Sequence, residues 1–212
     1  GRLLKPPRNG IIILKNEAPA KGDEVNIYDF DKTIYRDDST VDFYRYCLRH
    51  NKKTLLALPR TALYGLKYLT GFCDKTAFKQ AFFSFLKYLD DTPSMVESFW
   101  KVHADKIKEC YRKRRRPDDI IISASPEFLL RPACKDEVLI ASRVDPSSGV
   151  FSGKNCFGPE KVIRLRELYP DCRPEEFYSD SLSDTPLAEI AREAYIVQGD
   201  RLIPWAEYAK NN

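Results

Sequence analysis

Histidine and closely spaced cysteine are scarce in this sequence, and their scarcity excludes several kinds of site. The 212 residues include only two histidines, His50 and His103, and neither stands in a metal-ligand or triad spacing. Six cysteines are scattered without any Cys-x-x-Cys pair. We therefore expect reduced thiols in a cytoplasmic protein, with neither a disulfide framework nor a zinc site. A histidine-activated nucleophile is not expected either.

Long apolar runs and a strong net charge are also missing. No segment reaches the roughly 18 uninterrupted apolar residues of a membrane span. The net charge of +4 is too small to predict nucleic acid as a partner. The run Ile11–Leu14 falls short of the roughly 7–15 apolar residues of a secretory signal, so no signal peptide is expected. We expect residues 1–24 to form a loosely attached arm, with at most a short edge strand at 11–14.

Residues 39–116 have a helical pattern with little strand-like alternation. The polar segment Asp37-Asp38-Ser39 supplies a capping-type helix start, with Asp37 interpreted as a capping residue. Further along, Phe78, Phe82 and Phe85 recur at spacings of three and four, which places them on one helical face. These features predict a helical bundle of roughly eighty residues.

The pattern changes after Pro117, where short apolar segments alternate with helical ones. Strands are predicted at 119–123, 138–141, 176–179 and 194–197, with the last of these closing the sheet. Helices are predicted at 126–134, 161–169 and 185–192. A hairpin is predicted around the Asp-Pro-Ser-Ser-Gly turn at 145–149.

Alternating strands and helices predict a mostly parallel sheet covered by helices on both faces. The sequence thus predicts an α/β protein with a Rossmann-like, three-layer core. That core comprises residues 25–36 and 117–212, and the helical bundle of residues 37–116 is inserted into it as a cap.

The most informative segment begins at Val25, where a short apolar strand runs into Asp29-Phe30-Asp31-Lys32-Thr33. In an extended strand Asp29, Asp31 and Thr33 would all point to the same side. Two carboxylates that project together need a divalent cation or a shared proton. Such a pair suits a metal-assisted nucleophile beside a general acid. An ordinary acidic turn after the strand is the alternative.

Later strands of the predicted sheet also end in polar side chains. Ser123 closes one strand, and Asp180 follows another, with Asp184 four residues later. Lys161 lies near the start of the helix between them. Alone, Ser123 would suggest a turn and Lys161 a solvated helix face. Because ligands bind at the carboxyl ends of parallel strands, these groups are expected to converge with Asp29.

In these motifs the sequence resembles the haloacid dehalogenase-like phosphatases. That family has Asp-x-Asp-x-Thr after an apolar strand, a Ser or Thr closing a later strand, a lysine on a following helix, and two acids four residues apart. Here the motifs fall, in order, on Asp29, Asp31 and Thr33, on Ser123, on Lys161, and on Asp180 and Asp184. The helical insertion resembles the cap of the phosphoserine phosphatase-like branch, which includes phosphatidylglycerophosphate phosphatase-like relatives.

The resemblance implies a magnesium-dependent phosphomonoester hydrolase. It implies that Asp29 attacks phosphorus to form an aspartyl-phosphate, and that Asp31 is the general acid and base. The implied phosphate-binding groups are Phe30 and Ala124 through their backbone N–H groups, together with Asp31, Ser123 and Lys161. The implied Mg²⁺ site consists of Asp29, the Asp31 carbonyl and Asp180, with Asp184 steadying a water ligand of the ion.

Several positions depart from the family pattern. Lys32 and Ser179 stand where many members have glycine, without replacing a catalytic group. Ser125 differs from the glycine pair of phosphoserine phosphatases, and we interpret it as a turn residue. Asp38 falls where those enzymes hold a substrate amino group, although its side chain is shorter than the glutamate found there.

The substrate and partners are open to more than one interpretation. A small organic phosphate or a phospholipid head group fits the aromatic and basic cap. Residues 55–72, in which Arg60 and Lys67 stand among leucines and tyrosines, suit either packing within the cap or contact with a membrane surface. The basic run 112–116 suits a solvated helix end or an anion-binding surface.

Two other functions are compatible with parts of the sequence. A metal-dependent glycosyltransferase would explain Asp-x-Asp, but it would leave the later strand-end residues unexplained. A non-enzymatic binding module could use the run 112–116, but it would leave the acids and Lys161 without a role.

Overall fold

The computed structural model describes residues 25–211, so the short strand expected at 11–14 lies outside the described residues. Six strands form one sheet: β1 (Val25–Tyr28), β2 (Ile120–Pro126), β3 (Val138–Ser142), β4 (Pro174–Ser179), β5 (Glu193–Gln198) and β6 (Arg201–Pro204). Their order across the sheet is β3-β2-β1-β4-β5-β6, and β6 alone is antiparallel to its neighbour. This mostly parallel sheet, with the first strand central, confirms the predicted α/β class.

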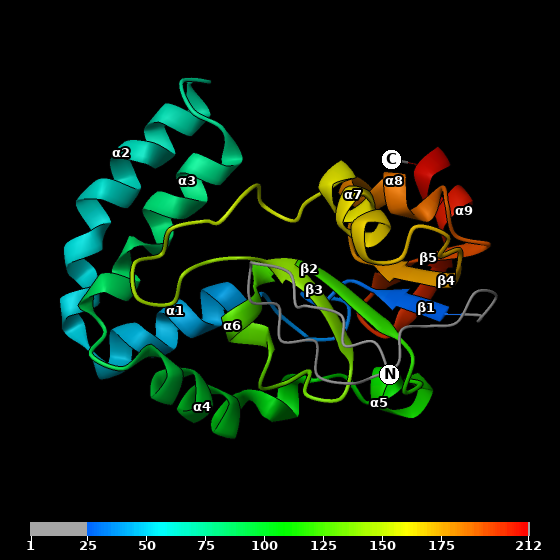
Figure 1. The fold of residues 1–212 in the computed structure, drawn as a ribbon, viewed down its shortest axis with the longest axis horizontal. Coiled ribbons are helices and arrows are strands. Elements are labelled where there is room, and N and C mark those ends of the chain that lie inside the picture. Colours follow the sequence, from blue (N-terminus) through cyan, green and yellow to red (C-terminus); the bar gives the residue numbers. More distant parts are fainter. Residues whose placement is uncertain (1–24, 212) are drawn as a thin grey trace, which may run out of the picture.

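Helices account for most of the remaining chain (Figure 1). The α-helices are α1 (Ser39–His50), α2 (Leu58–Leu69), α3 (Lys75–Phe82), α4 (Thr92–His103), α5 (Glu109–Arg114), α6 (Glu127–Leu130), α7 (Pro159–Leu168), α8 (Thr185–Ala188) and α9 (Trp205–Lys210). Short 3₁₀ helices occur at Lys52–Ala57, Phe83–Tyr88, Ala104–Lys106 and Leu182–Asp184.

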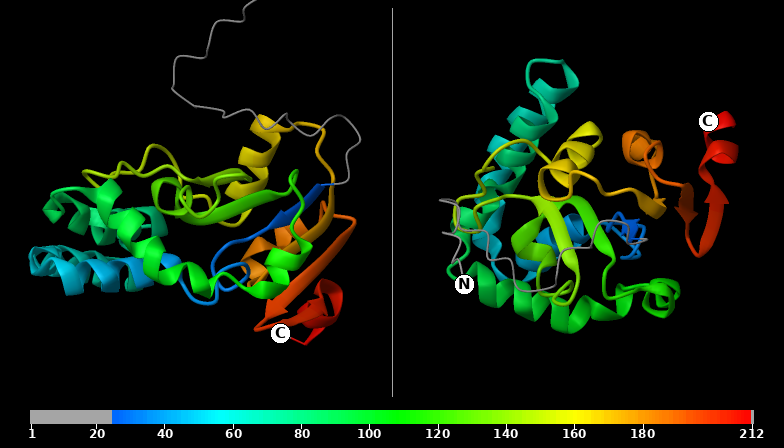
Figure 2. Two further views of the ribbon diagram at one scale, coloured as in Figure 1. Left: turned by 90° about the horizontal axis from the view of Figure 1, so that it is seen from below. Right: turned by 45° about the vertical axis from the view of Figure 1, so that its right-hand side comes forward.

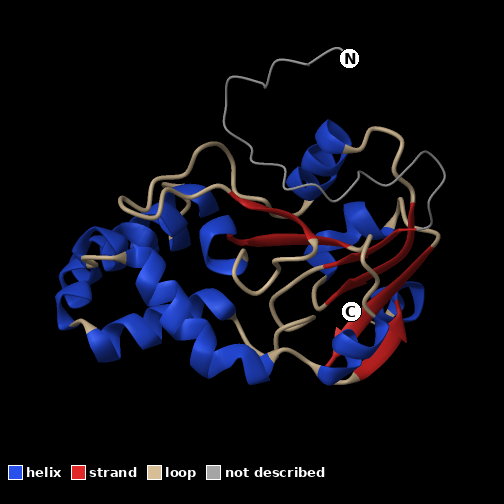
Figure 3. Cartoon of the chain, turned by 60° about the horizontal axis from the view of Figure 1, so that its bottom comes forward, coloured by secondary structure: helices blue, strands red, loops and turns tan. Residues whose placement is uncertain are grey.

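Alternation along the strands divides the core into two layers. Ile27 of β1 and Phe177 of β4 pack in a cluster with Leu165 of α7 and Leu187 of α8. The next residue of β1, Tyr28, packs on the opposite face in a cluster that includes Phe99 of α4. Figure 3 shows helices on both sides of the sheet, as the sequence predicts.

The helical segment between β1 and β2 lies mainly to one side of the sheet (Figures 1 and 2). Its inner side is aromatic, with Phe43, Phe85 and Phe99 buried. Trp100 of α4 connects the segment to α6, which follows β2, because its indole Nε1 donates a 2.6 Å hydrogen bond to the Leu129 carbonyl. The division into core and cap stays a prediction, since the two parts share one hydrophobic cluster.

Several predicted elements differ from the structure at their ends. The strand at 194–197 is not the last one: Arg201–Pro204 pairs antiparallel with β5, and α9 follows. Gly199, with a φ of +61°, forms part of the tight turn between these strands. The helices expected at 126–134 and 185–192 are each limited to four residues.

The start of α1 confirms a cap within the predicted polar segment and corrects the role of Asp37. Asp38, not Asp37, is the N-cap, because its Oδ1 accepts a 2.9 Å hydrogen bond from the Val41 N–H. Asp37 instead accepts a 2.8 Å ion-pair hydrogen bond from Lys106. Two adjacent acids before a helix both fit the capping pattern, so the sequence alone does not identify which of them is the N-cap.

Candidate active site

The segment after β1 is a tight turn, which corrects the expected geometry of the first motif. β1 ends at Tyr28, and the N–H groups of Ile34 and Tyr35 both donate to the Phe30 carbonyl at 2.9 Å. Lys32 has a φ of +59°, so an extended strand cannot run through it. The alternation expected to align Asp29, Asp31 and Thr33 therefore does not apply beyond the strand end.

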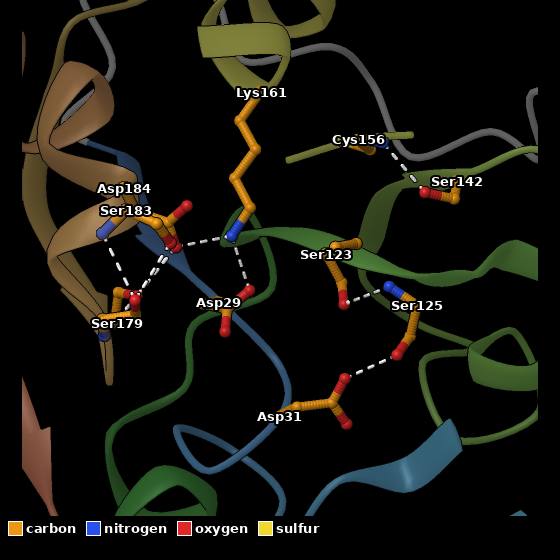
Figure 4. Close-up of polar contacts among 12 residues, drawn as sticks. Asp29, Asp31, Ser123, Ser125, Ser142, Cys156, Lys161, Ser179, Ser183 and Asp184 are labelled. Atoms are coloured by element: carbon orange, nitrogen blue, oxygen red, sulfur yellow. Dashed lines mark hydrogen bonds and ion pairs between the residues drawn. The ribbon is translucent and has the colours of Figure 1, made fainter. Parts of the chain in front are cut away.

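Lys161 joins the first and last motifs. Its Nζ lies 2.6 Å from Asp29 Oδ1 and 2.7 Å from Asp184 Oδ2, and its side chain is only 2% exposed. In Figure 4 the lysine extends from α7 to both carboxylates. Asp29 and Lys161, which are 132 positions apart in the chain, thus meet at the end of the sheet where the parallel strands finish.

Local backbone geometry delivers Lys161 to this place. Gly158 precedes α7 with a φ of +56°, in the left-handed region that favours glycine. A Cβ atom at this position would lie 3.3 Å from the Ser183 carbonyl oxygen. Pro159 then begins the helix, a position at which its missing N–H has no helical partner to lose. Lys161 follows in the first turn.

Burial sets the electrostatics of the Asp29–Lys161 pair. It raises the pKa of Asp29, and the positive charge of Lys161 opposes that rise. The neighbouring carboxylates Asp29 and Asp184 raise the pKa of Lys161 despite its burial, which would otherwise lower it. The ammonium is therefore charged, and at 2.6 Å it favours the ionised form of Asp29.

Asp31 lies in a different hydrogen-bonding environment. Its Oδ2 accepts a 2.5 Å hydrogen bond from Ser125 Oγ, and its Oδ1 accepts one of 2.7 Å from the Ser39 N–H. Burial and the charge of Asp38 raise the pKa of Asp31 to about 6, while these hydrogen bonds limit the rise. Asp31 is thus suited to gain and lose a proton near neutral pH.

Ser125 lies in the candidate site, whereas its sequence context predicts a turn residue. The turn prediction is wrong, because β2 continues to Pro126 and Ser125 is buried. Besides its bond to Asp31, its Oγ lies 2.9 Å from Thr40 Oγ1 of α1. Ser123 lies beside it, and its Oγ accepts a 3.1 Å hydrogen bond from the Ser125 N–H. Figure 4 shows Ser125 turned toward Asp31.

Lys79 of α3 is a second site residue that was not predicted. Its Nζ donates to the Ala124 carbonyl at 3.0 Å and to Asn155 Oδ1 at 3.3 Å. Burial lowers the pKa of Lys79 to about 8, and the charge of Asp31 acts in the opposite direction. The helical segment thus contributes a cation beside the candidate phosphate-binding residue Ala124. No sequence pattern signals this contact, because α3 was identified only by its phenylalanine face.

The two acids after β4 hold different positions. Asp184 is buried, and its Oδ2 accepts hydrogen bonds from Lys161 and, at 2.8 Å, from Ser179 Oγ. Asp180 is half-buried directly after β4, and burial raises its pKa. The Asp29 N–H donates to the Tyr178 carbonyl of β4 at 2.8 Å, so Asp180, directly after β4, lies at the same end of the sheet as Asp29.

The chemistry of these oxygens suits a hard divalent cation. Asp184 Oδ1 is buried and has no hydrogen-bond partner among the described residues. Within residues 25–211, no three His, Cys, Asp or Glu side chains gather into a ligand cluster of their own. Mg²⁺ does not require one, because it keeps several waters and binds through one or two carboxylates together with substrate phosphate. The residues present therefore fit this ion.

The basic run 112–116 is largely engaged within the protein. Arg112 donates to the Ala104 carbonyl at 2.7 Å, Arg115 pairs with Glu137 at 2.7 Å, and Arg116 pairs with Glu175 at 3.2 Å. These contacts favour a structural role at the end of α5.

Within the described part of the chain, no helix is both long and apolar enough to span a bilayer.

Comparisons with known proteins agree with this geometry. A family model described as haloacid dehalogenase-like hydrolase matches residues 27–189. Protein CicA of Caulobacter vibrioides is 37% identical over 83 residues, which are 35% of this chain and 37% of that protein. The match thus spans little more than a third of the length of that relative.

Two solved structures share the fold. A protein of unknown function from Bordetella pertussis Tohama I aligns with a TM-score of 0.68 and 19% identity, over 82% of this chain and 89% of that one. A phosphoserine phosphohydrolase-like protein from Francisella tularensis aligns with a TM-score of 0.51 and 14% identity, over 82% and 87%. Both support the Rossmann-like arrangement inferred from the strand order.

Proposed function

Because this chain belongs to the haloacid dehalogenase-like hydrolase family, we propose that it is a magnesium-dependent phosphomonoesterase acting through an aspartyl-phosphate intermediate. One observation carries the proposal: Lys161 Nζ lies within 2.7 Å of both Asp29 and Asp184. A buried ammonium between two carboxylates beside a polar strand end suits a site that accumulates negative charge during reaction.

Asp29 is the proposed nucleophile. Its ionised carboxylate attacks phosphorus and forms a new P–O bond while the ester P–O bond breaks. Lys161 holds the Asp29 carboxylate in place through Oδ1, which leaves Oδ2 for the attack. The product of this step is an aspartyl-phosphate on Asp29 and a free alcohol.

Asp31 is the proposed general acid and base. It gives its proton to the departing alkoxide in the first step, and it then takes a proton from the water that attacks the aspartyl-phosphate. That second step releases inorganic phosphate and restores both aspartates. A pKa of about 6 supports both transfers. The hydrogen bonds from Ser125 and the Ser39 N–H orient the carboxylate.

The proposed phosphate-binding groups are Ser123, Lys161 and the backbone N–H groups of Phe30 and Ala124. Asp29, the Asp31 carbonyl, Asp180 and Asp184 are the groups that would hold Mg²⁺. When bound, Mg²⁺ would neutralise charge on the transferring phosphoryl group. The orphaned Asp184 Oδ1 supports this assignment.

We also propose that the helical segment 37–116 is a cap over a core formed by 25–36 and 117–212. Lys79 supports this role because it reaches from α3 to Ala124 beside the site. A cation there favours a substrate with negative charge beyond the transferred phosphate, such as a small organic phosphate or a phospholipid head group. Asp38 remains a candidate for contact with a substrate amino group, although one of its oxygens caps α1.

All six cysteines, each within the described range, are unpaired. This supports a reducing compartment such as the cytoplasm as the proposed location.

A substrate panel tests the proposed function. The full chain is incubated with Mg²⁺ and a panel of phosphate monoesters that includes para-nitrophenyl phosphate, and released phosphate is measured. We expect turnover of at least one ester, and loss of that turnover both in Asp29→Asn and on chelation of the metal. Asp90→Asn, which alters an exposed carboxylate in the helical segment, is the matched control and should retain activity. Equal turnover by Asp29→Asn and wild type would refute the nucleophile assignment.

A further inference from the structure

Helix α2 buries none of its residues, although half of them are large and apolar. Leu63 is 52% exposed, Leu66 61% and Leu69 82%, and Phe72 in the turn that follows is 83% exposed. Leu58 is exposed as well. These five residues are called the α2 surface below. Single exposed leucines are ordinary, but a contiguous set on one helix marks an interaction site.

Helical spacing places these side chains on one side of α2. Leu58, Leu66 and Leu69 follow one another at intervals of eight and three residues, and Leu63 lies five residues after Leu58. At 3.6 residues per turn, these intervals leave the leucines within one arc of the helix. The α2 surface is therefore a continuous apolar stripe.

The side of α2 next to the leucine stripe already has a partner. Tyr68 stacks on Phe78 of α3 with ring centroids 5.6 Å apart, and Thr61 Oγ1 donates to the Ala81 carbonyl at 3.3 Å. Because α3 occupies that side, the leucine stripe faces outward. Figures 1 and 2 show α2 and α3 at the end of the molecule away from β4 to β6. Docking through α2 would therefore leave the sheet and the candidate active site at its strand ends uncovered.

Charge identifies the kind of partner that this surface fits. Residues 51–73 contain four cations, Lys52, Lys53, Arg60 and Lys67, and no Asp or Glu. Arg60 and Lys67 lie beside the stripe, each over the ring of Tyr64 at 5.7 and 5.0 Å. A second copy of the chain docking through the same surface would bring its own four cations into the contact, and the like charges would repel one another. An apolar stripe flanked by basic residues with long stems instead matches an anionic lipid surface.

We propose that the α2 surface docks onto anionic lipid bilayers, with the leucines and Phe72 inserted at the interface and the four cations facing the lipid head groups. Docking of this kind is peripheral and reversible, because one amphipathic helix of three turns buries limited apolar area. It does not depend on the phosphatase assignment, so either one can fail alone.

Vesicle sedimentation tests the proposal. The full chain is mixed with vesicles of phosphatidylcholine alone, or of phosphatidylcholine with about 30% phosphatidylglycerol. We expect binding to the anionic vesicles and at least tenfold weaker binding to the neutral ones. The double variant Leu63→Ser/Leu66→Ser should bind the anionic vesicles at least tenfold more weakly, because two inserted side chains are lost.

A matched control separates insertion from general surface hydrophobicity. The double variant Val102→Ser/Val150→Ser removes two apolar side chains that are 61% and 44% exposed but lie outside α2. It should bind the anionic vesicles like the wild type. Circular dichroism and thermal unfolding establish that both double variants are folded, as expected for changes at exposed positions.

A charge variant tests the electrostatic half of the proposal. Arg60→Gln/Lys67→Gln should weaken binding to anionic vesicles about tenfold and leave binding to neutral vesicles unchanged. The proposal is overturned if wild type remains unbound with anionic vesicles, or if the Leu63/Leu66 variant binds them as well as wild type does. Light scattering that shows a wild-type dimer dispersed by the same leucine changes would instead assign the surface to self-association, and would also overturn it.

Discussion

The Lys161 ammonium lies 2.6 Å from Asp29 Oδ1, and both side chains are almost fully buried. A second carboxylate, Asp184, accepts from the same ammonium at 2.7 Å. The lysine therefore compensates two acids that could not both remain charged inside the protein without it. This arrangement links the stability of the site to its chemistry.

Replacing Lys161 by methionine should destabilise the protein in a pH-dependent way. Without the ammonium, two buried carboxylates lose their partner, which costs about 3–5 kcal/mol of the free energy of unfolding near pH 7.5. At pH 5 the loss should be smaller, because Asp29, whose pKa burial raises, then carries a proton at little cost. Urea unfolding at the two pH values measures the difference. An equal loss at both would contradict the charge-compensation role.

Ser125→Ala should alter the proton chemistry of Asp31. The hydrogen bond from Ser125 lowers the pKa of Asp31, so its removal should raise that pKa above about 6. We expect kcat to fall roughly tenfold, and the limb of the pH–rate profile that Asp31 controls to move to higher pH. Ser147→Ala, in the exposed turn after β3, is the control and should leave the profile unchanged. A fall in kcat with an unshifted profile would indicate a merely structural role.

Lys79 should make substrate binding sensitive to alkaline pH. Burial depresses its pKa to about 8, so the side chain is charged at pH 7 and loses its charge as the pH rises through 8. If this cation holds an anionic substrate, KM should rise severalfold between pH 7 and pH 9. Lys79→Arg should remove that rise, since a guanidinium stays charged throughout.

The matched control for this prediction is Lys87→Arg, at an exposed position of the same helical segment. Steady-state kinetics with it should reproduce the wild-type KM profile. A Lys79→Arg profile that still rises above pH 8 would contradict the role assigned to Lys79.

Asp119→Asn should stabilise the protein at neutral and alkaline pH. Burial raises the pKa of Asp119 to about 6 in the folded protein, whereas an aspartate in the unfolded chain titrates at about pH 4. The folded state therefore holds this proton more tightly than the unfolded state, and that contribution to stability is lost as the pH rises from about 4 through 6. In the wild type the Arg116 N–H donates a 2.7 Å hydrogen bond to Asp119 Oδ2. An asparagine can still accept this hydrogen bond through its amide oxygen, and it avoids burying a charge. We expect a gain of about 1–2 kcal/mol in unfolding free energy at pH 8 that shrinks toward pH 4. A gain that did not change with pH would point to packing instead.

The order of strands and helices could be predicted because their hydrophobic patterns are local. Ile120 to Ile122 is a continuous apolar run, as buried parallel strands require, and the acids or hydroxyls after such runs occur at one sheet edge by topology. The turn after β1 could not be predicted. It depends on Lys32 adopting a positive φ, which is uncommon for lysine.

The contacts that cross the chain were also beyond sequence reasoning. Whether Ser125 ends a strand or begins a turn depends on α1, since Ser125 bonds to Thr40, 85 positions away. Lys79 meets the carbonyl of Ala124 only because α3 packs toward β2. Such contacts depend on tertiary packing, for which a single sequence carries no periodic signal.

The central claim is that Asp29 carries the phosphoryl group between substrate and water. The most direct measurement is acid quenching of Asp31→Asn after reaction with para-nitrophenyl phosphate and Mg²⁺, followed by peptide mass spectrometry. The nitrophenolate leaves without a proton, but the second step lacks its base. We predict that phosphate accumulates on the peptide containing Asp29 and is absent from Asp29→Asn/Asp31→Asn. Phosphate on Ser123 or Ser125, or no phosphopeptide while turnover continues, would contradict the account.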